Sequence, residues 1–428
     1  MKYLPLQSEM FEKNRAELVK HLEPNSIAIF HSNDEMPYNG DQFHPFKQNS
    51  DLFYLCGIDQ EETILLIYPD CPDPKYRAAL FLKKTNEHIA IWEGHKFTEG
   101  EATATSGITT IHWKEEFNSI FNMLMNHASS LYLNSNENDR ASILVETREM
   151  RFAKEMQQRY PMHKLARLAP IMAQLRVKKS KWEQELMNTA CEITRKAYLR
   201  VLNTIKPGRM EYEVEADVTH EFMLNRANGH AYSPIIASGA SACVLHYVDN
   251  NQECKDGDLI LMDFGACYAN YCADLTRTIP VNGRFTERQK TVYNACLNVQ
   301  KEALNMIKAG MILKEYNAEV GKVMESELKR IGLISDQDIK NQNPAWPAYK
   351  KYFMHGTGHF LGLDVHDIGN HYEPIPVGAA MTCEPGIYIK EEGIGIRIEN
   401  DVVITENGLL DFMSNFPREV DEIEDAMN

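Results

Sequence analysis

Residues 259–279 read LILMDFGACYANYCADLTRTI, and this stretch decides the fold of the second half of the chain. Its first part is an apolar run interrupted by Asp263, and its last part alternates into Leu275 and Ile279, so both are predicted to be buried strands joined by a short turn. Asp263 and Asp274 are 11 positions apart, since 274 − 263 = 11. An odd separation lets two residues lie opposite each other across an antiparallel hairpin, on the same side. Two such carboxylates repel each other unless a cation lies between them, so the pair predicts a metal site.

A second segment rich in acids and histidines follows at residues 353–367, FMHGTGHFLGLDVHD. Three histidines and two aspartates fall within 13 residues, which is an unusual density for a surface. His355 and His359 have the spacing of an HExxH zinc helix, but the glutamate is missing and each intervening glycine would cost a helix about 1 kcal/mol. The glycines instead indicate a loop or bent strand that passes close to another group, and this segment is the third candidate source of a metal ligand.

Two glutamates complete the candidate set. Glu384 lies in TCEPGIY, residues 382–388, after an apolar stretch and before a Pro-Gly turn. Glu399 lies in GIGIRIENDVVI, residues 393–404, which is predicted to be one strand with Arg397 and Glu399 as neighbours on one face. Such a pair could be only a salt bridge at a sheet edge, but the flanking isoleucines favour a buried strand, where unpaired charge is costly.

These segments together offer four carboxylates and one imidazole, from Asp263, Asp274, His359, Glu384 and Glu399. With two ions some carboxylates must bridge, which holds the metals about 3.5–4 Å apart. Ligation dominated by oxygen favours Mn²⁺, while Co²⁺, Fe²⁺ and Zn²⁺ would also bind. Water shared by two cations has a lowered pKa, so the predicted chemistry is metal-assisted hydrolysis with no serine or cysteine nucleophile.

The rest of the chain predicts an α/β (α+β) protein of two domains. Short apolar runs at 26–30, 63–68 and 78–82 are predicted strands and 117–127 a helix, which together suggest a small α/β domain. A basic connector then precedes a helix start in which Ser180 and Glu183 form a capping box. The predicted domains are therefore 1–172 and 173–428.

The second domain shows a faint internal duplication. One long helix ends in Ile205-Lys-Pro-Gly208, and another, capped at Thr286 and Gln289, ends in Ile307-Lys-Ala-Gly310. A further helical segment and acid-bearing strands follow each of them. The repeated order favours a duplicated α/β half, although any two capped helices that end in glycine would look alike.

Composition indicates which classes of partner are disfavoured and which cellular compartment is expected. The formal net charge of −16 disfavours nucleic acid and anionic membranes as partners. The sequence has no apolar run long enough for a bilayer, and its N-terminus lacks the pattern of a secretory signal. The cysteines number 9, which is odd, and in the absence of an export signal they are expected to be free thiols in a reducing cytoplasm. They form no CxxC pair, which argues against a zinc ribbon. We therefore expect a cytoplasmic protein.

The motifs MDFGACYANYCADLTRT, HGTGHFLGLDVHD, CEPGIY and GIRIEND, with ligands in the order Asp, Asp, His, Glu, Glu, resemble those of the pita-bread metallopeptidases, and among them the Xaa-Pro aminopeptidases (aminopeptidase P). The resemblance covers nearly the whole chain, since NSDLFYL at 49–55 is similar to the family's amino-terminal domain. The one departure is Asn400, where relatives usually carry aspartate. The implied architecture is a creatinase/aminopeptidase P-like amino-terminal domain followed by a pita-bread catalytic domain with two pseudo-twofold halves of helices and antiparallel strands.

The resemblance also implies two Mn²⁺ ions and hydrolysis of the bond between an N-terminal residue and a proline in second position. Asp274 and Glu399 would bridge the two ions. Asp263 would be a further ligand of one ion, and His359 and Glu384 would be further ligands of the other. Glu384 would also accept a proton from water, and a neutral histidine is suited to protonate the imide nitrogen as it leaves. The other implied catalytic or substrate-binding residues surround the tetrahedral intermediate, the proline pocket and the leaving group: His246, His355, His366, Tyr388 and Arg397.

Several related functions stay open at this point. Proline dipeptidase uses the same fold and ligands on X-Pro dipeptides, although the NSDLFYL segment favours the aminopeptidase. Methionine aminopeptidase shares the ligand order but usually lacks so large an amino-terminal domain. Pita-bread proteins that lost their metals act as binding modules, and creatinase-like relatives work without metal, but both have replaced ligands that are all present here. Relatives are commonly dimers or tetramers, so a homo-oligomer is expected.

Overall fold

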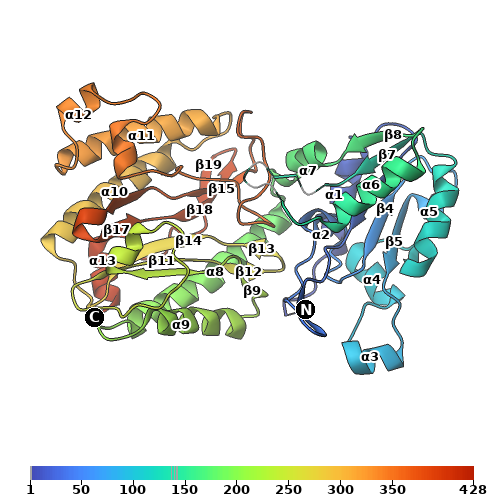
Figure 1. Cartoon of the computed structure of the whole chain (residues 1–428), viewed down its shortest axis with the longest axis horizontal. Helices are drawn as coiled ribbons and strands as arrows, with labels where there is room; N and C mark the ends of the chain where they lie inside the picture. Colours follow the sequence, from blue (N-terminus) through green and yellow to red (C-terminus); the bar gives the residue numbers. More distant parts are fainter. Residues whose placement is uncertain (1, 136, 139, 141–142) are drawn as a thin grey trace. The chain divides into compact units, whose positions relative to one another are not determined.

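The computed structural model describes residues 2–135, 137–138, 140 and 143–428. Apart from Lys2, the described residues form an amino-terminal unit that ends at Arg176 and a carboxy-terminal unit, Val177–Asn428. The predicted boundary at 172/173 lies inside helix α7 (Ala169–Arg176), and the chain divides at the end of this helix instead. In Figure 1 the amino-terminal unit is coloured blue to green and the carboxy-terminal unit green to red.

A six-stranded sheet forms the centre of the amino-terminal unit, in the order β6-β5-β4-β1-β7-β8. The three predicted strands and the predicted helix are present as β1, β4, β5 and α5. The sheet is mixed, because β1 is antiparallel to β4 but parallel to β7. The strands of this unit are β1 (Ser26–His31), β2 (Pro37–Asn39), β3 (Gln42–Phe43), β4 (Ile64–Ile67), β5 (Ala78–Leu82), β6 (Ile111–Trp113), β7 (Ser130–Leu133) and β8 (Lys164–Arg167).

Helices cover this sheet and bury an aromatic core against it. Phe81 of β5 packs edge-on against Phe117, which stacks on Phe121 one turn further along α5. The segment NSDLFYL forms α2, whose N-cap Asn49 accepts hydrogen bonds from two backbone amides. Besides α7, the helices of the unit are α1 (Ser8–Val19), α2 (Ser50–Cys56), α3 (Glu87–Glu93), α4 (Glu99–Ser106), α5 (Phe117–Met125) and α6 (Arg148–Arg159).

The carboxy-terminal unit repeats one order of elements. Two long helices, α8 and α9, precede the sheet β10-β11-β14, and two more, α10 and α11, precede the sheet β15-β18-β19. Both predicted capping boxes are present, at Ser180/Glu183 and at Thr286/Gln289. Figure 1 shows the strands of this unit between the α8–α9 pair and the α10–α11 pair. The described fold thus confirms the predicted class, with helices and antiparallel strands in two similar halves.

The elements of the carboxy-terminal unit have the following bounds. Its helices are α8 (Lys181–Thr204), α9 (Glu211–Leu224), α10 (Glu287–Met306), α11 (Leu313–Arg330), α12 (Asp336–Lys340) and α13 (Val420–Ala426). Its strands are β9 (Gly229–His230), β10 (Ile235–Ser238), β11 (Leu259–Phe264), β12 (Ala266–Tyr268), β13 (Tyr271–Cys272), β14 (Leu275–Pro280), β15 (Ala380–Cys383), β16 (Gly386–Ile389), β17 (Ile394–Arg397), β18 (Asn400–Thr405) and β19 (Gly408–Asp411). Within the described ranges, none of the helices combines the length and the apolar character that crossing a membrane requires.

Candidate metal centre

The two aspartates lie on one face of neighbouring strands, but not directly opposite each other as the spacing predicted. Asp263 of β11 pairs with Thr276 of β14, and Asp274 precedes β14 by one residue. The register of β11 and β14 continues unchanged through β12 and β13 to a turn at Ala269–Asn270, so Asp274 falls opposite Gly265 and is a diagonal neighbour of Asp263. Both carboxylates accept a hydrogen bond from the Tyr232 hydroxyl, at 2.6 and 2.5 Å, which shows that they face the same side.

His359 is held in the orientation that a metal ligand needs. Its segment forms no helix, as the missing glutamate and the glycines predicted. The Nδ1–H donates to the carbonyl oxygen of Phe360 at 2.9 Å, because that oxygen can only accept. Nε2 therefore carries the lone pair, and it lies 3.4 Å from Asp274 Oδ2 and 3.6 Å from Glu384 Oε1. A hydrogen bond that fixes the other ring nitrogen is the usual way a protein orients a histidine ligand.

Gly358 allows this segment to pass against β15. A Cβ atom at Gly358 would lie 2.2 Å from the carbonyl oxygen of Thr382, whereas one at Gly356 would meet nothing closer than 3.6 Å. We expect Gly358→Ala to lower the melting temperature and weaken metal binding, because the backbone that carries His359 must move away from β15. Gly356→Ala is the matched control and should change both quantities little. Thermal melting and calorimetric metal titration measure the melting temperature and the metal affinity of both variants. Equal values for the two variants would contradict the close approach of Gly358 to β15.

The two glutamates adjoin strands of the sheet β15-β18-β19. Glu384 directly follows β15, and Glu399 lies between β17 and β18. The predicted single strand over 393–404 is wrong, because the chain leaves one sheet and joins another at Ile398–Glu399. The predicted burial is confirmed, with Glu399 2% exposed. Its Oε2 accepts a hydrogen bond of 2.6 Å from the Thr276 hydroxyl.

Ligand atoms of Asp274, His359 and Glu399 all lie within 4.8 Å of one another. No other group of three or more such side chains in the described residues comes this close. Burial, together with the neighbouring carboxylates, raises the pKa of Glu384 above its ordinary value and that of Glu399 well above it. The cationic groups of the protein therefore do not neutralise the negative charge of these carboxylates, whereas bound divalent cations would neutralise it. The donor set, one imidazole and otherwise carboxylate oxygens, fits such ions.

The other predicted site residues extend from this cluster. His355 Nε2 and Tyr388 Oη are 2.8 Å apart, and Arg397 Nη1 donates to the same hydroxyl at 2.8 Å. Arg397 also pairs with Asp263. Burial lowers the pKa of His355 to about 3, and the charge of Arg397 adds to this effect, so the imidazole is neutral.

Two further predicted histidines also adjoin the cluster. The ring of His366 meets that of His359 edge to face, with centroids 4.4 Å apart. His246 is exposed on the loop after the 3₁₀ turn Gly239–Cys243, and its charge contributes to lowering the pKa of His355. The fold thus gathers every predicted ligand and every predicted substrate-binding residue within one unit.

Sequence reasoning missed three residues that support the ligands. Tyr232 bonds to both aspartates, and the Thr276 hydroxyl contacts Glu399 and accepts from Arg397 Nε at 3.0 Å. Asp401 Oδ2 accepts from the backbone amide of Asp274 at 2.9 Å. Thr276 could have been found, because it lies two positions after Asp274 on the same face of a strand. Tyr232 had no such signal, since it is far from both aspartates in the sequence.

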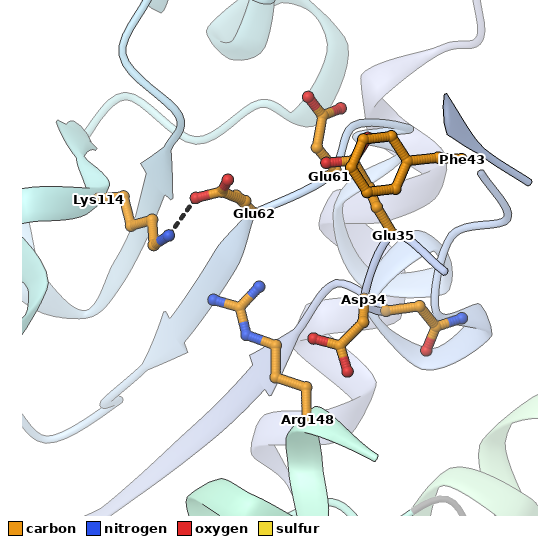
Figure 2. Close-up of a pocket in the computed structure, with 8 residues that line it drawn as sticks. Asp34, Glu35, Phe43, Glu61, Glu62, Lys114 and Arg148 are labelled. Carbon is orange, nitrogen blue, oxygen red and sulfur yellow. Dashed lines mark hydrogen bonds and ion pairs between the residues drawn. The ribbon is translucent and has the colours of Figure 1, made fainter. Parts of the chain in front are cut away.

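A second concentration of charge lies in the amino-terminal unit (Figure 2). Three of its four carboxylates have cationic partners: Asp34 pairs with Arg151 at 2.8 Å, Glu61 with Lys96, and Glu62 with Lys114. The residues that line this pocket include no histidine or cysteine, so they do not resemble a transition-metal site. They are Asn33, Asp34, Glu35, Phe43, Glu61, Glu62, Lys114 and Arg148.

A duplicated helix-and-strand unit that concentrates four acids and a histidine is the architecture of a metallopeptidase, and comparison with known families agrees. The model of metallopeptidase family M24 matches residues 185–406, and that of the aminopeptidase P N-terminal domain matches residues 11–132. The chain belongs to metallopeptidase family M24.

Individual relatives match along almost the whole chain. The Xaa-Pro aminopeptidase of Haemophilus influenzae is 32% identical over 99% of this chain and 98% of its own length. Escherichia coli aminopeptidase P, solved with zinc substituted and in complex with product, has a TM-score of 0.88 at 30% identity and covers 99% of both chains. The same enzyme solved with the inhibitor Pro-Leu has a TM-score of 0.86 at 30% identity, again over 99% of each chain.

Proposed function

We propose that this chain is a metallo-aminopeptidase that hydrolyses the bond between an N-terminal residue and a proline in second position. The observation that carries the proposal is the close approach of Asp274, His359 and Glu399, with Asp263 and Glu384 beside them. Relatives named Xaa-Pro aminopeptidase match over nearly their full length, so the chain has both domains of such an enzyme.

Two divalent ions fit these five side chains. Asp274 and Glu399 would bind both ions. Asp263 would be a further ligand of one ion, and His359 and Glu384 would be further ligands of the other. The bound ions would polarise the scissile carbonyl and lower the pKa of water. Glu384, which directly follows β15, would take the proton of that water. Mn²⁺ is our proposed native metal, because carboxylate oxygens dominate the set.

Cleavage before proline places a particular demand on the leaving group. An imide nitrogen has no hydrogen of its own, so it must gain a proton as the bond breaks. His355 is neutral and hydrogen-bonded to Tyr388, whose hydroxyl is in turn held by Arg397. The proton that Glu384 takes from the water would pass to the imide nitrogen, which balances the step. We assign orientation of the leaving nitrogen and support of the proline ring to His355, Tyr388 and Arg397, with His246 and His366 as further substrate contacts.

A panel of peptides tests the proposed reaction. With added Mn²⁺ we expect hydrolysis of X-Pro-Y tripeptides and longer peptides, little hydrolysis of X-Pro dipeptides and none of Met-Ala peptides. A chelator should abolish the activity. Cleavage of dipeptides alone would favour proline dipeptidase, and activity that resists the chelator would refute the metal mechanism.

The inhibitor Pro-Leu favours the aminopeptidase over the dipeptidase. The Escherichia coli relative has been solved with this dipeptide, which has the form of the product released from an X-Pro-Leu substrate. A site that accommodates a residue after proline has room for peptides longer than two residues.

We also propose a homo-oligomer, either a dimer or a tetramer, in the cytoplasm. All nine cysteines are thiols, which is consistent with a reducing compartment. Light scattering of the purified protein gives the subunit number, and a monomer at micromolar concentration would refute the oligomer.

A further inference from the structure

Lys179 and Asp367 form a buried ion pair next to the loop that carries two site histidines. Lys179 Nζ lies 2.8 Å from Asp367 Oδ2, and each side chain is only 1% exposed. Lys179 precedes the N-cap of α8, and its backbone amide donates to the carbonyl of Gly378 at 2.8 Å. The pair therefore ties the start of α8 to the far end of the segment 355–367.

Asp367 also reaches the metal ligand through one carbonyl group. Its backbone amide donates to the oxygen of Phe360 at 2.9 Å, and this oxygen is the one that accepts Nδ1–H of His359. Phe360 is anchored on its other side by an isolated bridge to Met381. The position of Asp367 thus bears directly on the hydrogen bond that fixes the His359 tautomer.

Close packing around the pair leaves it little freedom. A Cβ atom at Gly362 would lie 2.2 Å from Asp367 Oδ2 and 2.7 Å from Lys179 Cε, so this glycine makes room for the ion pair. The residue before Asp367 is His366, whose ring packs against that of His359. A shift of Asp367 would therefore move both histidines.

We propose that the Lys179–Asp367 pair is a positioning device for the metal centre, which holds the Phe360 carbonyl where it orients the imidazole of His359. Neither side chain belongs to the proposed ligands or substrate-binding residues, so both are positioning residues. Removing one partner leaves the other charge buried without this ion pair, and such a charge draws in water or moves the loop. Partners that orient a ligand typically contribute 10- to 100-fold to metal affinity. This inference rests on the proposed function, because it takes His359 to be a metal ligand.

The test compares Mn²⁺ affinity in Asp367→Asn and Lys179→Met with that of the wild-type chain, by calorimetric titration of metal-free, folded protein. We expect Kd for Mn²⁺ to rise about 10- to 100-fold in both variants. Nitrogen NMR of the metal-free protein, labelled in histidine, should show that His359 loses its single tautomer. If the pair served only the stability of the fold, neither the Kd for Mn²⁺ nor the tautomer of His359 would change in the folded variants.

Asp51→Asn is the matched control. Asp51 forms a buried ion pair of 2.7 Å with Arg176, within the amino-terminal unit, so its loss should lower stability without changing Mn²⁺ affinity. If a single variant does not fold, the double variant Lys179→Met/Asp367→Leu removes both charges, and we expect the same weakened affinity. Folded variants with wild-type Mn²⁺ affinity and tautomer would overturn the positioning role. Failure of the wild-type chain itself to bind Mn²⁺ would instead overturn the proposed function.

Discussion

Glu399→Gln is expected to lower kcat/KM for X-Pro-Y peptides by at least about 10³-fold, since even partners outside the ligand shell contribute 10- to 100-fold. Glu399 is the proposed bridging ligand between β17 and β18, and its carboxylate is almost fully buried among other acids. An amide in its place offers one neutral oxygen and cannot bridge two cations as a carboxylate does. The variant should also bind less than the wild-type complement of metal, as measured by elemental analysis after dialysis.

Glu391→Gln provides the control for this substitution. Glu391 belongs to a short turn between β16 and β17, and its side chain is 66% exposed. The same chemical change there should leave metal content and kcat/KM within about twofold, because exposed charges contribute little. If Glu399→Gln retained full metal content and activity, Glu399 would not be a ligand.

Arg277→Met is expected to lower the free energy of unfolding of the carboxy-terminal unit by about 3 kcal/mol, because several buried acceptors lose their donor. Arg277 is fully buried, and Nη1 donates to the carbonyls of Glu399, at 2.5 Å, and of Thr276, at 3.0 Å. Nη2 donates to Asn400 Oδ1 at 2.8 Å. The guanidinium thus joins β14 of one half to the start of β18 in the other.

Calorimetric melting of metal-free protein measures this effect without the contribution of bound ions. Arg284→Met is the control, since Arg284 is 63% exposed and its ion pair with Glu424 should contribute no more than about 1 kcal/mol. The unfolding transition of the carboxy-terminal unit should shift markedly only for Arg277→Met. Equal shifts would mean that the buried hydrogen bonds of Arg277 contribute little.

Asn400, which we expect to be aspartate in related enzymes, uses both the donor and the acceptor of its side-chain amide. Its amide nitrogen donates to both carboxylate oxygens of Asp411, at 3.0 and 2.8 Å, while its oxygen accepts from Arg277. An aspartate there would face the carboxylate of Asp411 with no proton between them. Asparagine therefore supplies both the donor and the acceptor that this buried position uses.

The candidate ligands that the structure brings together could be selected from the sequence because several of them lie beside a strong local signal. Asp263 interrupts an apolar run, Glu384 precedes a Pro-Gly turn, and Gly358 marks the close approach that presents His359. Such signals depend on neighbours in the chain, and they survive folding. The capped starts of α8 and α10 were predictable for the same reason.

Strand register was not predictable, because it depends on contacts between distant segments. Gly265 lies opposite Asp274, where a Cβ atom would be 1.7 Å from the carbonyl oxygen of Ala273. The diagonal position of Asp274 follows from the turn at Ala269–Asn270, where both residues have positive φ and the register of β11–β14 continues into β12–β13. The break before Glu399 depends on a distant contact, since its backbone amide donates to the Thr276 carbonyl of the other half, at 3.1 Å. That contact joins segments far apart in the sequence, so no local pattern indicates it.

Anomalous diffraction at the manganese edge, from crystals grown with Mn²⁺, would locate the metal ions and their ligands. Two peaks about 3.5–4 Å apart are expected. Both should lie within bonding distance of Asp274 and Glu399, with Asp263 on one and His359 and Glu384 on the other. A single peak, or peaks bound by other residues, would contradict a dinuclear centre held by these five side chains.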